Sequence, residues 1–274
     1  MNTETIQRQY DEVVAAHFDL DPQGVNAGSL DRSEAQVRAW MSGKAEGGPF
    51  RVLDLGMGTG QFLSRLAALL GNRMVPSGLD ISEKMIDRAR ARVPGLTAEV
   101  GSAAQLDEHF PGQSFDLVST HFVTGFVPMK VLAPMIWARL AKGGCWSFAG
   151  GMMTSFPALQ AKANSPLVRW LGSRRAPAPD QMVSNPAGQE EVVQTLEQNG
   201  FTVRACEMYK PRLEFRNFDQ FMEFAYRGSW LTPFVEAAGL HKAGRITQFL
   251  MNRFVFPLVD HHHIVIALAQ KVGD

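Results

Sequence analysis

Arg51-Val52-Leu53-Asp54-Leu55-Gly56-Met57-Gly58-Thr59-Gly60-Gln61-Phe62 has the pattern of a strand, a turn and the start of a helix. Residues 52–55 are apolar apart from one acid, which is typical of a buried central strand of a parallel sheet. The three glycines that follow let the backbone turn sharply and approach a ligand closely, because they carry no Cβ. Residues 61–70 then predict a helix whose N-terminus points at the same turn. The stretch therefore predicts a binding site for a small ligand with a polar tail.

The spacing of the glycines separates two kinds of nucleotide-binding fold. A dinucleotide fold has the fingerprint G-x-G-x-x-G, whose third glycine would fall where this chain has Gln61, so a pyrophosphate ligand is disfavoured. The G-x-G-x-G spacing with an acid before it resembles motif I of the class I S-adenosylmethionine-dependent methyltransferases. That resemblance implies S-adenosylmethionine as the cofactor, with its methionine part along the turn. The residues that it assigns to cofactor binding here are Asp54, Gly56, Met57, Gly58 and Gly60.

Length and composition limit the possible classes of protein. The chain has 274 residues, 45% of them hydrophobic, which suffices for one large α/β domain. Lysine and arginine together number 27, as do aspartate and glutamate, so no overall charge favours nucleic acid, an anionic membrane or a strongly charged substrate. Cys145 and Cys206 are the only cysteines, which excludes a disulfide framework. Because the chain shows no export signal and no long apolar run, we expect a cytoplasmic protein without a membrane span.

Asp80 ends the second predicted strand, residues 74–80, at about the distance from the glycine turn that nucleotide-binding units use for a ribose-binding acid. A carboxylate there can accept hydrogen bonds from both ribose hydroxyls. The alternative is an acid that only caps the helix beginning near Ser82. Ile81 and Met85 are expected to offer adenine an apolar surface.

The third predicted strand, residues 96–100, is followed by Gly101-Ser102-Ala103. The resembling family often has Gly-Asp-Ala here, with the acid accepting from the adenine amino group. Serine replaces that acid in this chain. We therefore expect a hydroxyl or backbone groups at Ser102 and Ala103 to contact adenine instead.

His121 lies near the end of the fourth predicted strand, residues 114–123. Ligands of open α/β sheets bind at the carboxyl ends of the strands, so we expect His121 beside the reacting methyl group and in contact with the cofactor. A histidine of ordinary pKa would suit proton removal from a hydroxyl or amine, which makes His121 the candidate catalytic residue. The alternative is a histidine that only packs or hydrogen-bonds against the cofactor. Phe126, on the following loop, is a candidate for the substrate pocket.

Two segments outside the predicted sheet are expected to cover the site. Residues 1–45 contain an amphipathic helix, and the resemblance implies that its Tyr10 closes over the cofactor; the alternative is that Tyr10 only packs the helix down. Residues 152–255 contain a cap insertion that is dense in aromatic residues. Most of these are expected to form a core, while Tyr226 and Trp230 are candidates for an apolar or aromatic substrate pocket.

Three adjacent histidines, His261, His262 and His263, lie in the last predicted strand, residues 258–271. Alternation along a strand directs His262 opposite to the other two, and no acid or cysteine cluster accompanies them. We therefore expect no metal site.

The family landmarks occur in order across residues 51–150, so the resemblance implies an architecture for the whole chain. We expect a single methyltransferase domain over residues 1–274 with a Rossmann-like α/β fold. Its doubly wound, seven-stranded sheet would be mostly parallel with an antiparallel last strand, and a helical substrate cap would cover it. The implied activity is methyl transfer from S-adenosylmethionine to an oxygen, nitrogen or carbon of a small, largely apolar or aromatic metabolite, with no nucleic-acid or membrane partner. A protein that binds S-adenosylmethionine without methyl transfer and a nicotinamide-dependent dehydrogenase remain the alternatives.

Overall fold

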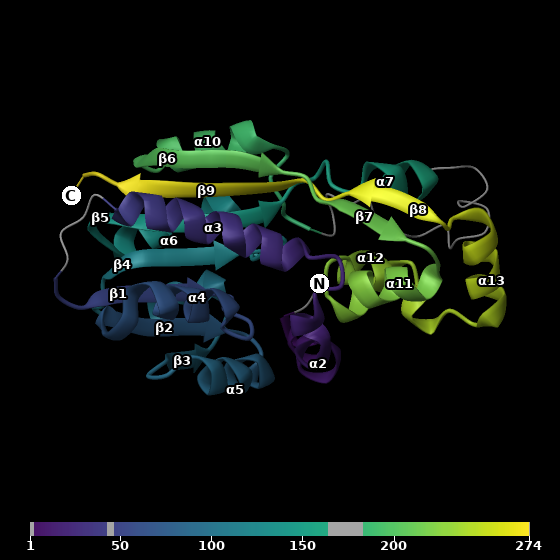
Figure 1. Cartoon of the computed structure of the whole chain (residues 1–274), viewed down its shortest axis with the longest axis horizontal. Coiled ribbons are helices and arrows are strands. Elements are labelled where there is room, and N and C mark those ends of the chain that lie inside the picture. The colour runs from purple at the N-terminus through teal and green to yellow at the C-terminus, as the bar shows by residue number, and fades with distance from the viewer. Residues whose placement is uncertain (1–2, 43–46, 164–182, 274) are drawn as a thin grey trace.

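The computed structural model describes residues 3–42, 47–163 and 183–273. A seven-stranded sheet forms the centre of the molecule, with its strands in the order β3-β2-β1-β4-β5-β9-β6 (Figure 1). β9 runs antiparallel to both of its neighbours, and the other strands are parallel to one another. The predicted Rossmann-like sheet, mostly parallel with an antiparallel last strand, is confirmed. Its strands are β1 Phe50–Leu55, β2 Met74–Asp80, β3 Thr97–Val100, β4 Phe115–His121, β5 Leu140–Gly151, β6 Phe201–Tyr209 and β9 Ile264–Lys271.

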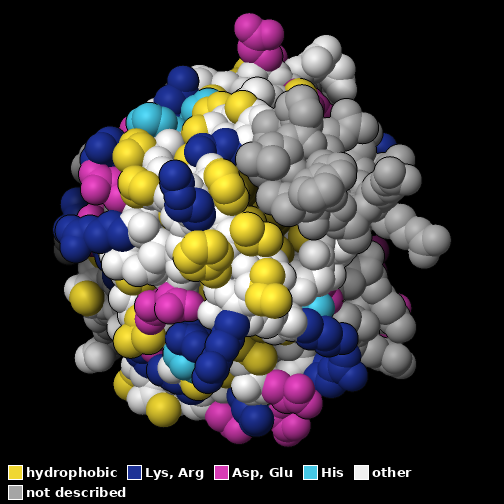
Figure 2. Space-filling model, turned by 90° about the vertical axis from the view of Figure 1, so that its right-hand side faces the viewer, with side chains coloured by type: hydrophobic (Ala, Val, Ile, Leu, Met, Phe, Trp, Pro, Cys, Tyr) yellow, Lys and Arg dark blue, Asp and Glu magenta, His cyan; other side chains and the backbone are white. Residues whose placement is uncertain are grey.

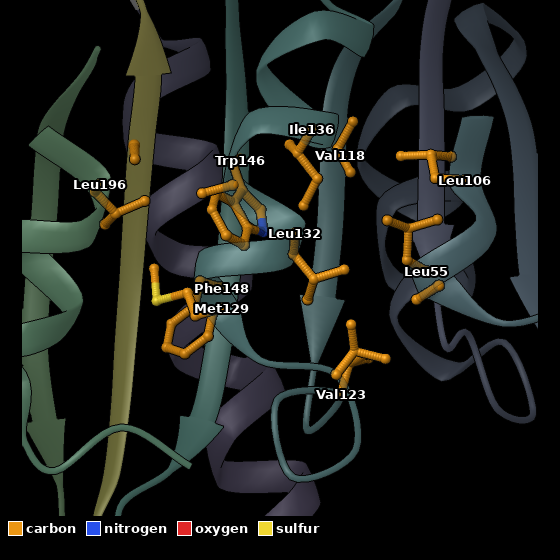
Figure 3. Close-up of a cluster of buried hydrophobic side chains, with 14 of the residues drawn as sticks. Leu55, Leu106, Val118, Val123, Met129, Leu132, Ile136, Trp146, Phe148 and Leu196 are labelled. Carbon is orange, nitrogen blue, oxygen red and sulfur yellow. The ribbon is translucent and has the colours of Figure 1, made fainter. Parts of the chain in front are cut away.

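Helices cover both faces of the sheet because the strands present alternate side chains to opposite sides. In β4, Leu117 belongs to one buried cluster and Val118 to another. The helices on the Leu117 face are α3 Val25–Met41, α4 Gln61–Leu70 and α5 Glu83–Arg92. Those on the Val118 face are the 3₁₀ helix η4 Ala103–Glu108, α6 Met129–Arg139 and α10 Gln189–Gln198. Figure 3 shows the cluster on this second face, which includes Trp146 of β5 and Leu132 and Ile136 of α6.

A cap lies beyond the carboxyl ends of the parallel strands, on the right in Figure 1. It contains a two-stranded antiparallel sheet and short helices around an aromatic-rich core that includes Phe215, Phe221 and Phe224. The ends of β5 and β9 enter this core through Ala149 and Ile264, so the cap packs directly on the sheet. Its elements are α7 Pro157–Ala163, β7 Arg212–Phe215, α11 Phe218–Met222, the π-helix η5 Glu223–Arg227, α12 Thr232–Ala237, the 3₁₀ helix η6 Leu240–Lys242, α13 Arg245–Phe254 and β8 Leu258–His261.

The last predicted strand, residues 258–271, differs from the structure. It divides at His262 and His263 into β8, which pairs with β7 in the cap, and β9, which belongs to the main sheet. At the division the backbone N–H of His262 donates to the carbonyl of Pro211 at 3.2 Å, outside either sheet. Both halves are rich in apolar residues, so the sequence pattern continues across the point where the chain changes its pairing partner.

The N-terminal segment runs between the sheet and the cap (Figure 1). The Gln9 amide donates to Thr232 Oγ1 of the cap at 2.8 Å, and Asp19 accepts from Thr59 Oγ1 of the glycine turn at 2.6 Å. One short segment therefore contacts both parts of the molecule. No helix in the described ranges is long and apolar enough to cross a bilayer. The helical turns of the segment are α1 Thr3–Gln9, the π-helix η1 Tyr10–Val14, α2 Ala15–His17 and the 3₁₀ helix η2 Phe18–Leu20.

Candidate cofactor and acceptor site

The glycine turn between β1 and α4 has a left-handed backbone at every glycine. Gly56, Gly58 and Gly60 have φ angles of 69°, 54° and 75°, which other residues rarely adopt. The N–H of Gly56 donates to the carbonyl of Leu79 at 2.7 Å, which ties the turn to β2. A Cβ on Gly56 would come within 2.6 Å of the Val123 side chain, so this close approach also requires glycine.

Asp80 holds the turn from the end of β2. Its Oδ2 accepts from the N–H of Gly58 at 2.8 Å and its Oδ1 from the N–H of Ser82 at 2.9 Å. Burial raises the pKa of Asp80 to about 6; the two N–H groups oppose the rise, and the nearby carboxylate of Asp11 adds to it. A carboxylate has about four lone-pair positions, so two remain for hydroxyl donors. This acceptor capacity beside a left-handed glycine turn fits a ribose and the methionine part of S-adenosylmethionine.

The apolar residues expected at adenine lie next to Asp80 in the chain, where the N-terminal segment packs. Met85 is fully buried and forms a small cluster with Val14 and Ala15. Ile81 is partly exposed. The N-terminal segment thus covers Met85, and of the two residues predicted to contact adenine only Ile81 is accessible in this structure.

Ser102 and Ala103 lie at the start of η4. Ser102 Oγ accepts from the N–H of Ala104 at 3.3 Å and so caps that helix, while Ala103 is buried. The N–H of Gly101 donates to the backbone carbonyl of Asp80 at 2.9 Å. That hydrogen bond keeps the predicted adenine contacts close to the predicted ribose acid.

Asp19 is a residue of the site that the sequence interpretation did not identify. It accepts from Thr59 Oγ1 at 2.6 Å and from Gln61 Nε2 at 2.7 Å, both at the glycine turn. Arg88 and Arg92 of α5 pair with its Oδ2 at 2.9 and 2.8 Å. Burial acts to raise the pKa of Asp19, but hydrogen bonds from Arg92, Thr59 and Gln61 outweigh it and hold that pKa well below its usual range. These residues, which we call the Asp19 cluster, fasten the N-terminal segment over the turn.

Tyr10 joins the N-terminal segment to the cap and to the loop after β4. Its hydroxyl donates to Ser229 Oγ at 3.2 Å, and its ring meets Phe126 edge-on with centroids 6.1 Å apart. Burial raises the pKa of Tyr10 to about 12, so the phenol stays protonated. Two predicted site residues, Tyr10 and Phe126, are thus brought together. Tyr226 instead stacks on His241, with centroids 5.8 Å apart.

His121 and Asp54 belong to a group of polar side chains beside the N-terminus of α4. Asp54 accepts from Ser119 Oγ at 2.7 Å, and His121 Nε2 lies 3.2 Å from Ser147 Oγ. The imidazole meets the Phe62 ring edge-on at 4.3 Å, and its buried Nδ1 has no partner among the described residues. Burial raises the pKa of Asp54 to about 7 and lowers that of His121 to about 3. His121 is therefore neutral at physiological pH, and it does not change its protonation state near the pKa of an ordinary histidine.

Rings from four distant parts of the chain meet where β4 ends and the cap begins. Phe122 has a left-handed φ of 62°, and its ring lies 4.7 Å from Trp230. His262 stacks on Phe156 at 4.7 Å and meets Trp230 edge-on at 5.2 Å. We call Phe122, Phe156, Trp230 and His262 the aromatic cluster. The sequence predicts only Trp230 as a pocket residue, although the strand alternation at His262 already directs that side chain away from its neighbours.

Two buried polar side chains near the end of β5, one of them His262 of the aromatic cluster, lack partners. His262 is 4% exposed, and within the described ranges neither its Nδ1 nor the buried Oγ1 of Thr124 has a hydrogen-bond partner. Thr124 Oγ1 is 2.8 Å from where a Cβ would stand on Gly150, and His262 Nε2 is 2.8 Å from the same position on Gly151, so the two side chains lie against opposite faces of β5. Burial lowers the pKa of His262 to about 3, and His263 adds to this effect, so the ring is neutral. Such unpaired atoms are uncommon in folded proteins and are candidate partners for a ligand's polar group.

The described residues contain no group of three or more His, Cys, Asp or Glu side chains arranged to hold a metal ion. The candidate site consists of the glycine turn, the Asp19 cluster, the polar group around His121 and the aromatic cluster. The first three adjoin the carboxyl ends of β1, β2 and β4, and the fourth joins them to the cap.

Known proteins resemble this chain in both sequence and structure. Residues 52–144 match the family model described as a methyltransferase domain. Phosphatidylethanolamine N-methyltransferase of Cereibacter sphaeroides is 30% identical over 148 residues, which are 53% of this chain and 66% of that protein. Trans-aconitate 2-methyltransferase of Methylobacterium nodulans is 36% identical over 98 residues, which are 35% of this chain and 36% of that protein. The chain thus spans less than two thirds of the length of either curated relative.

The YcgJ protein of Bacillus subtilis has a solved structure with a similar fold. Its TM-score is 0.57 at 15% sequence identity, and the match covers 89% of this chain and 100% of that one. The family match, residues 52–144, contains the glycine turn, Asp80 and His121. Residues 52–144 therefore form a methyltransferase domain of the class I, S-adenosylmethionine-dependent type, and S-adenosylmethionine is the cofactor of that domain.

Proposed function

We propose that the protein transfers a methyl group from S-adenosylmethionine to an oxygen, nitrogen or carbon of a small, largely apolar or aromatic molecule. The observation that supports this most directly is the junction at the end of β4. His121 contacts Phe62 at the start of α4, and the next residue, Phe122, contacts Trp230 of the cap. The predicted cofactor turn and the aromatic cluster are therefore neighbours, as the donor and acceptor of a methyl group must be.

The chemistry that we propose needs alignment and exclusion of water more than it needs a base. When bound, S-adenosylmethionine supplies a methyl group on a positively charged sulfonium. The glycine turn and Asp80 would fix the cofactor, and Tyr10, fastened to Ser229, would help to close the cap over it. His121, neutral and packed against Phe62, would position the reacting groups; the alternative is that it takes a proton from a neutral hydroxyl or amine.

The acceptor would lie in the aromatic cluster. Phe122, Phe156 and Trp230 favour an apolar or aromatic body, and the unpaired Nδ1 of His262 would hydrogen-bond a neutral polar group on it. Phe126, next to Tyr10, would line the same space. The two curated relatives are named for different acceptors, phosphatidylethanolamine and trans-aconitate, so the acceptor class rests on these side chains.

Incubation with methyl-labelled S-adenosylmethionine and a panel of aromatic hydroxyl, amine and activated carbon acceptors tests the proposal. We expect label in an acceptor with the natural protein and none with Gly58→Val. A ligand that co-purifies with the protein, identified by mass spectrometry, would be added to the panel. If the protein binds the cofactor but transfers label to none of these molecules, a protein that uses the cofactor without methyl transfer would be favoured. Absence of cofactor binding in calorimetry would contradict both the methyltransferase and the protein that binds the cofactor without methyl transfer.

A further inference from the structure

Helix α13, Arg245–Phe254, is attached to the cap along one side only. Met251 packs against the aromatic-rich core of the cap, and Asn252 Oδ1 accepts from the N–H of Phe218 at 2.7 Å. None of the helix residues is buried. In Figure 1 the helix forms the end of the molecule that lies farthest from the main sheet.

The free side of α13 is unusually apolar. Ile246 is 79% exposed and Phe249 67%, and they are followed by Phe254 at 46% and Val259 at 45%. Ile246 and Phe249 are three positions apart and so lie on the same side of the helix. Figure 2, which looks at this end of the molecule, shows hydrophobic side chains there, with lysine and arginine and some acidic side chains among them. Single exposed apolar residues are ordinary, but two bulky ones side by side on a helix with no buried residue are typical of an interaction surface.

The charges that α13 and its flanking segments carry have one sign, although Glu214 of β7 lies opposite Val259. Residues 237–259 contain Lys242, Arg245 and Arg253 but no aspartate or glutamate, although the whole chain has equal numbers of acidic and basic residues. The three basic side chains are exposed, and the Arg253 guanidinium lies over the Phe254 ring at 5.6 Å. An amphipathic helix with bulky apolar residues and flanking cations has the chemistry that binds anionic lipid headgroups.

We propose that α13 docks the protein reversibly on an anionic lipid surface. The helix lies in the plane of the interface, with Ile246 and Phe249 among the lipid chains and Arg245 and Arg253 at the headgroups. The balanced charge of the whole chain predicts no membrane partner because it averages over both ends of the molecule, whereas the docking surface is local. Docking does not depend on the proposed methyl transfer, so it is measured without cofactor or acceptor.

Co-sedimentation of the full-length protein with vesicles tests the proposal. We expect binding to phosphatidylcholine vesicles that contain phosphatidylglycerol, little binding to pure phosphatidylcholine, and weakening in high salt. The double variants Ile246→Ser with Phe249→Ser and Arg245→Gln with Arg253→Gln should each lower the partition coefficient roughly tenfold or more. Val75→Ser with Val100→Ser, at exposed positions of β2 and β3, is the matched control and should bind like the natural protein.

A fluorescent probe and a hydrodynamic measurement complete the test. The emission of Ile246→Trp should shift to shorter wavelength when anionic vesicles are added, because the indole leaves water. No binding to anionic vesicles, equal binding by the Ile246→Ser, Phe249→Ser variant, or an unshifted emission would overturn the proposal. So would concentration-dependent dimers in sedimentation velocity that this variant abolishes, since the surface would then belong to a second copy of the chain.

Discussion

The candidate site has a cofactor side, made of the glycine turn, Asp80 and the Asp19 cluster, and an acceptor side, made of the aromatic cluster. The two sides differ in how many of their buried polar atoms have hydrogen-bond partners within the protein. On the cofactor side the protein pairs its charged groups itself: Asp80 accepts from Gly58 and Ser82, and Asp19 accepts from two side chains at the turn. The buried Nδ1 of His121, at the boundary with the acceptor side, is unpaired among the described residues. On the acceptor side, aromatic rings surround His262, and its Nδ1 has no partner in the described ranges. An unpaired buried polar atom costs about 1–3 kcal/mol. The cofactor side is thus organised before any ligand arrives, whereas the acceptor side keeps hydrogen-bonding capacity for one.

The largest effect is expected at the turn. Gly58→Val should weaken binding of S-adenosylhomocysteine roughly 100-fold or more, because a branched side chain at a left-handed φ of 54° strains the turn and projects toward the ligand. Phe18 lies 3.4 Å from the new Cβ, so the N-terminal segment would be displaced as well. Isothermal calorimetry measures the affinity.

The control for backbone strain is Gly71→Val at the end of α4. Gly71 also has a positive φ, 57°, but nothing lies within 4 Å of an added Cβ there. This variant should lose stability yet keep its affinity for S-adenosylhomocysteine. Normal binding by a folded Gly58→Val protein would remove the turn from the cofactor site.

Asp80→Ala should weaken cofactor binding by roughly 10- to 100-fold, since a charge-assisted hydrogen bond contributes about 1.5–3 kcal/mol. Circular dichroism should show the fold intact. Calorimetry on Asp87→Ala provides the comparison, because Asp87 lies on the exposed side of α5 with its side chain 69% accessible. Equal affinities in the two variants would leave Asp80 with only a structural role at the turn.

On the acceptor side, His262→Phe keeps an aromatic ring against Phe156 and Trp230 and removes both ring nitrogens. If His262 binds the acceptor's polar group, KM for the acceptor found by label transfer should rise roughly tenfold while the Kd of S-adenosylhomocysteine stays unchanged. The variant should also unfold at a slightly higher temperature, because a buried unpaired nitrogen is gone. Higher stability with an unchanged KM would assign the histidine to packing alone.

How far the site could be predicted depends on how local its contacts are. The glycine turn is a run of adjacent residues whose backbone conformations follow from their type, and Asp80 follows it at a spacing set by one βα unit. The sheet was predictable because buried strands are apolar and alternate with helical patterns. The main exception is the division of the last strand into β8 and β9, which depends on Pro211 and β7 rather than on the strand's own residues.

The Asp19 cluster and the aromatic cluster could not be predicted in the same way. Asp19 and Arg92 are 73 residues apart, and an aspartate in a helical segment is ordinarily a solvated residue. Phe122 and His262 are farther apart still, and only the packing of the cap on the sheet brings their rings within 6.4 Å. The buried, neutral state of His121 likewise comes from neighbours such as Phe62 that no local pattern places beside it.

A smaller effect is expected where the N-terminal segment is fastened. Asp19→Asn should lower the free energy of unfolding by about 1–2 kcal/mol, because the ion pairs with Arg88 and Arg92 are partly exposed and only the charge is removed. The dissociation rate of S-adenosylhomocysteine should rise a few-fold in stopped-flow measurements as the segment opens more often. Asp87→Ala again serves as the control. A dissociation rate that does not change would separate the Asp19 cluster from closure of the site.

The smallest effect is expected at His121, and the pH dependence of the reaction tests whether this histidine acts as a base. Burial lowers the pKa of His121 to about 3 but raises that of Asp80 to about 6 and that of Asp54 to about 7, so these two acids, and not the histidine, change charge near neutrality. As pH falls through about 6, Asp80 is protonated and loses acceptor capacity, so kcat/KM for the cofactor, which reports the free enzyme, should fall. His121→Ala should keep this step and lose less than about tenfold in kcat, whereas Asp80→Asn should lack the step. A step that disappears in His121→Ala, together with a much larger loss of kcat, would instead make the histidine the base.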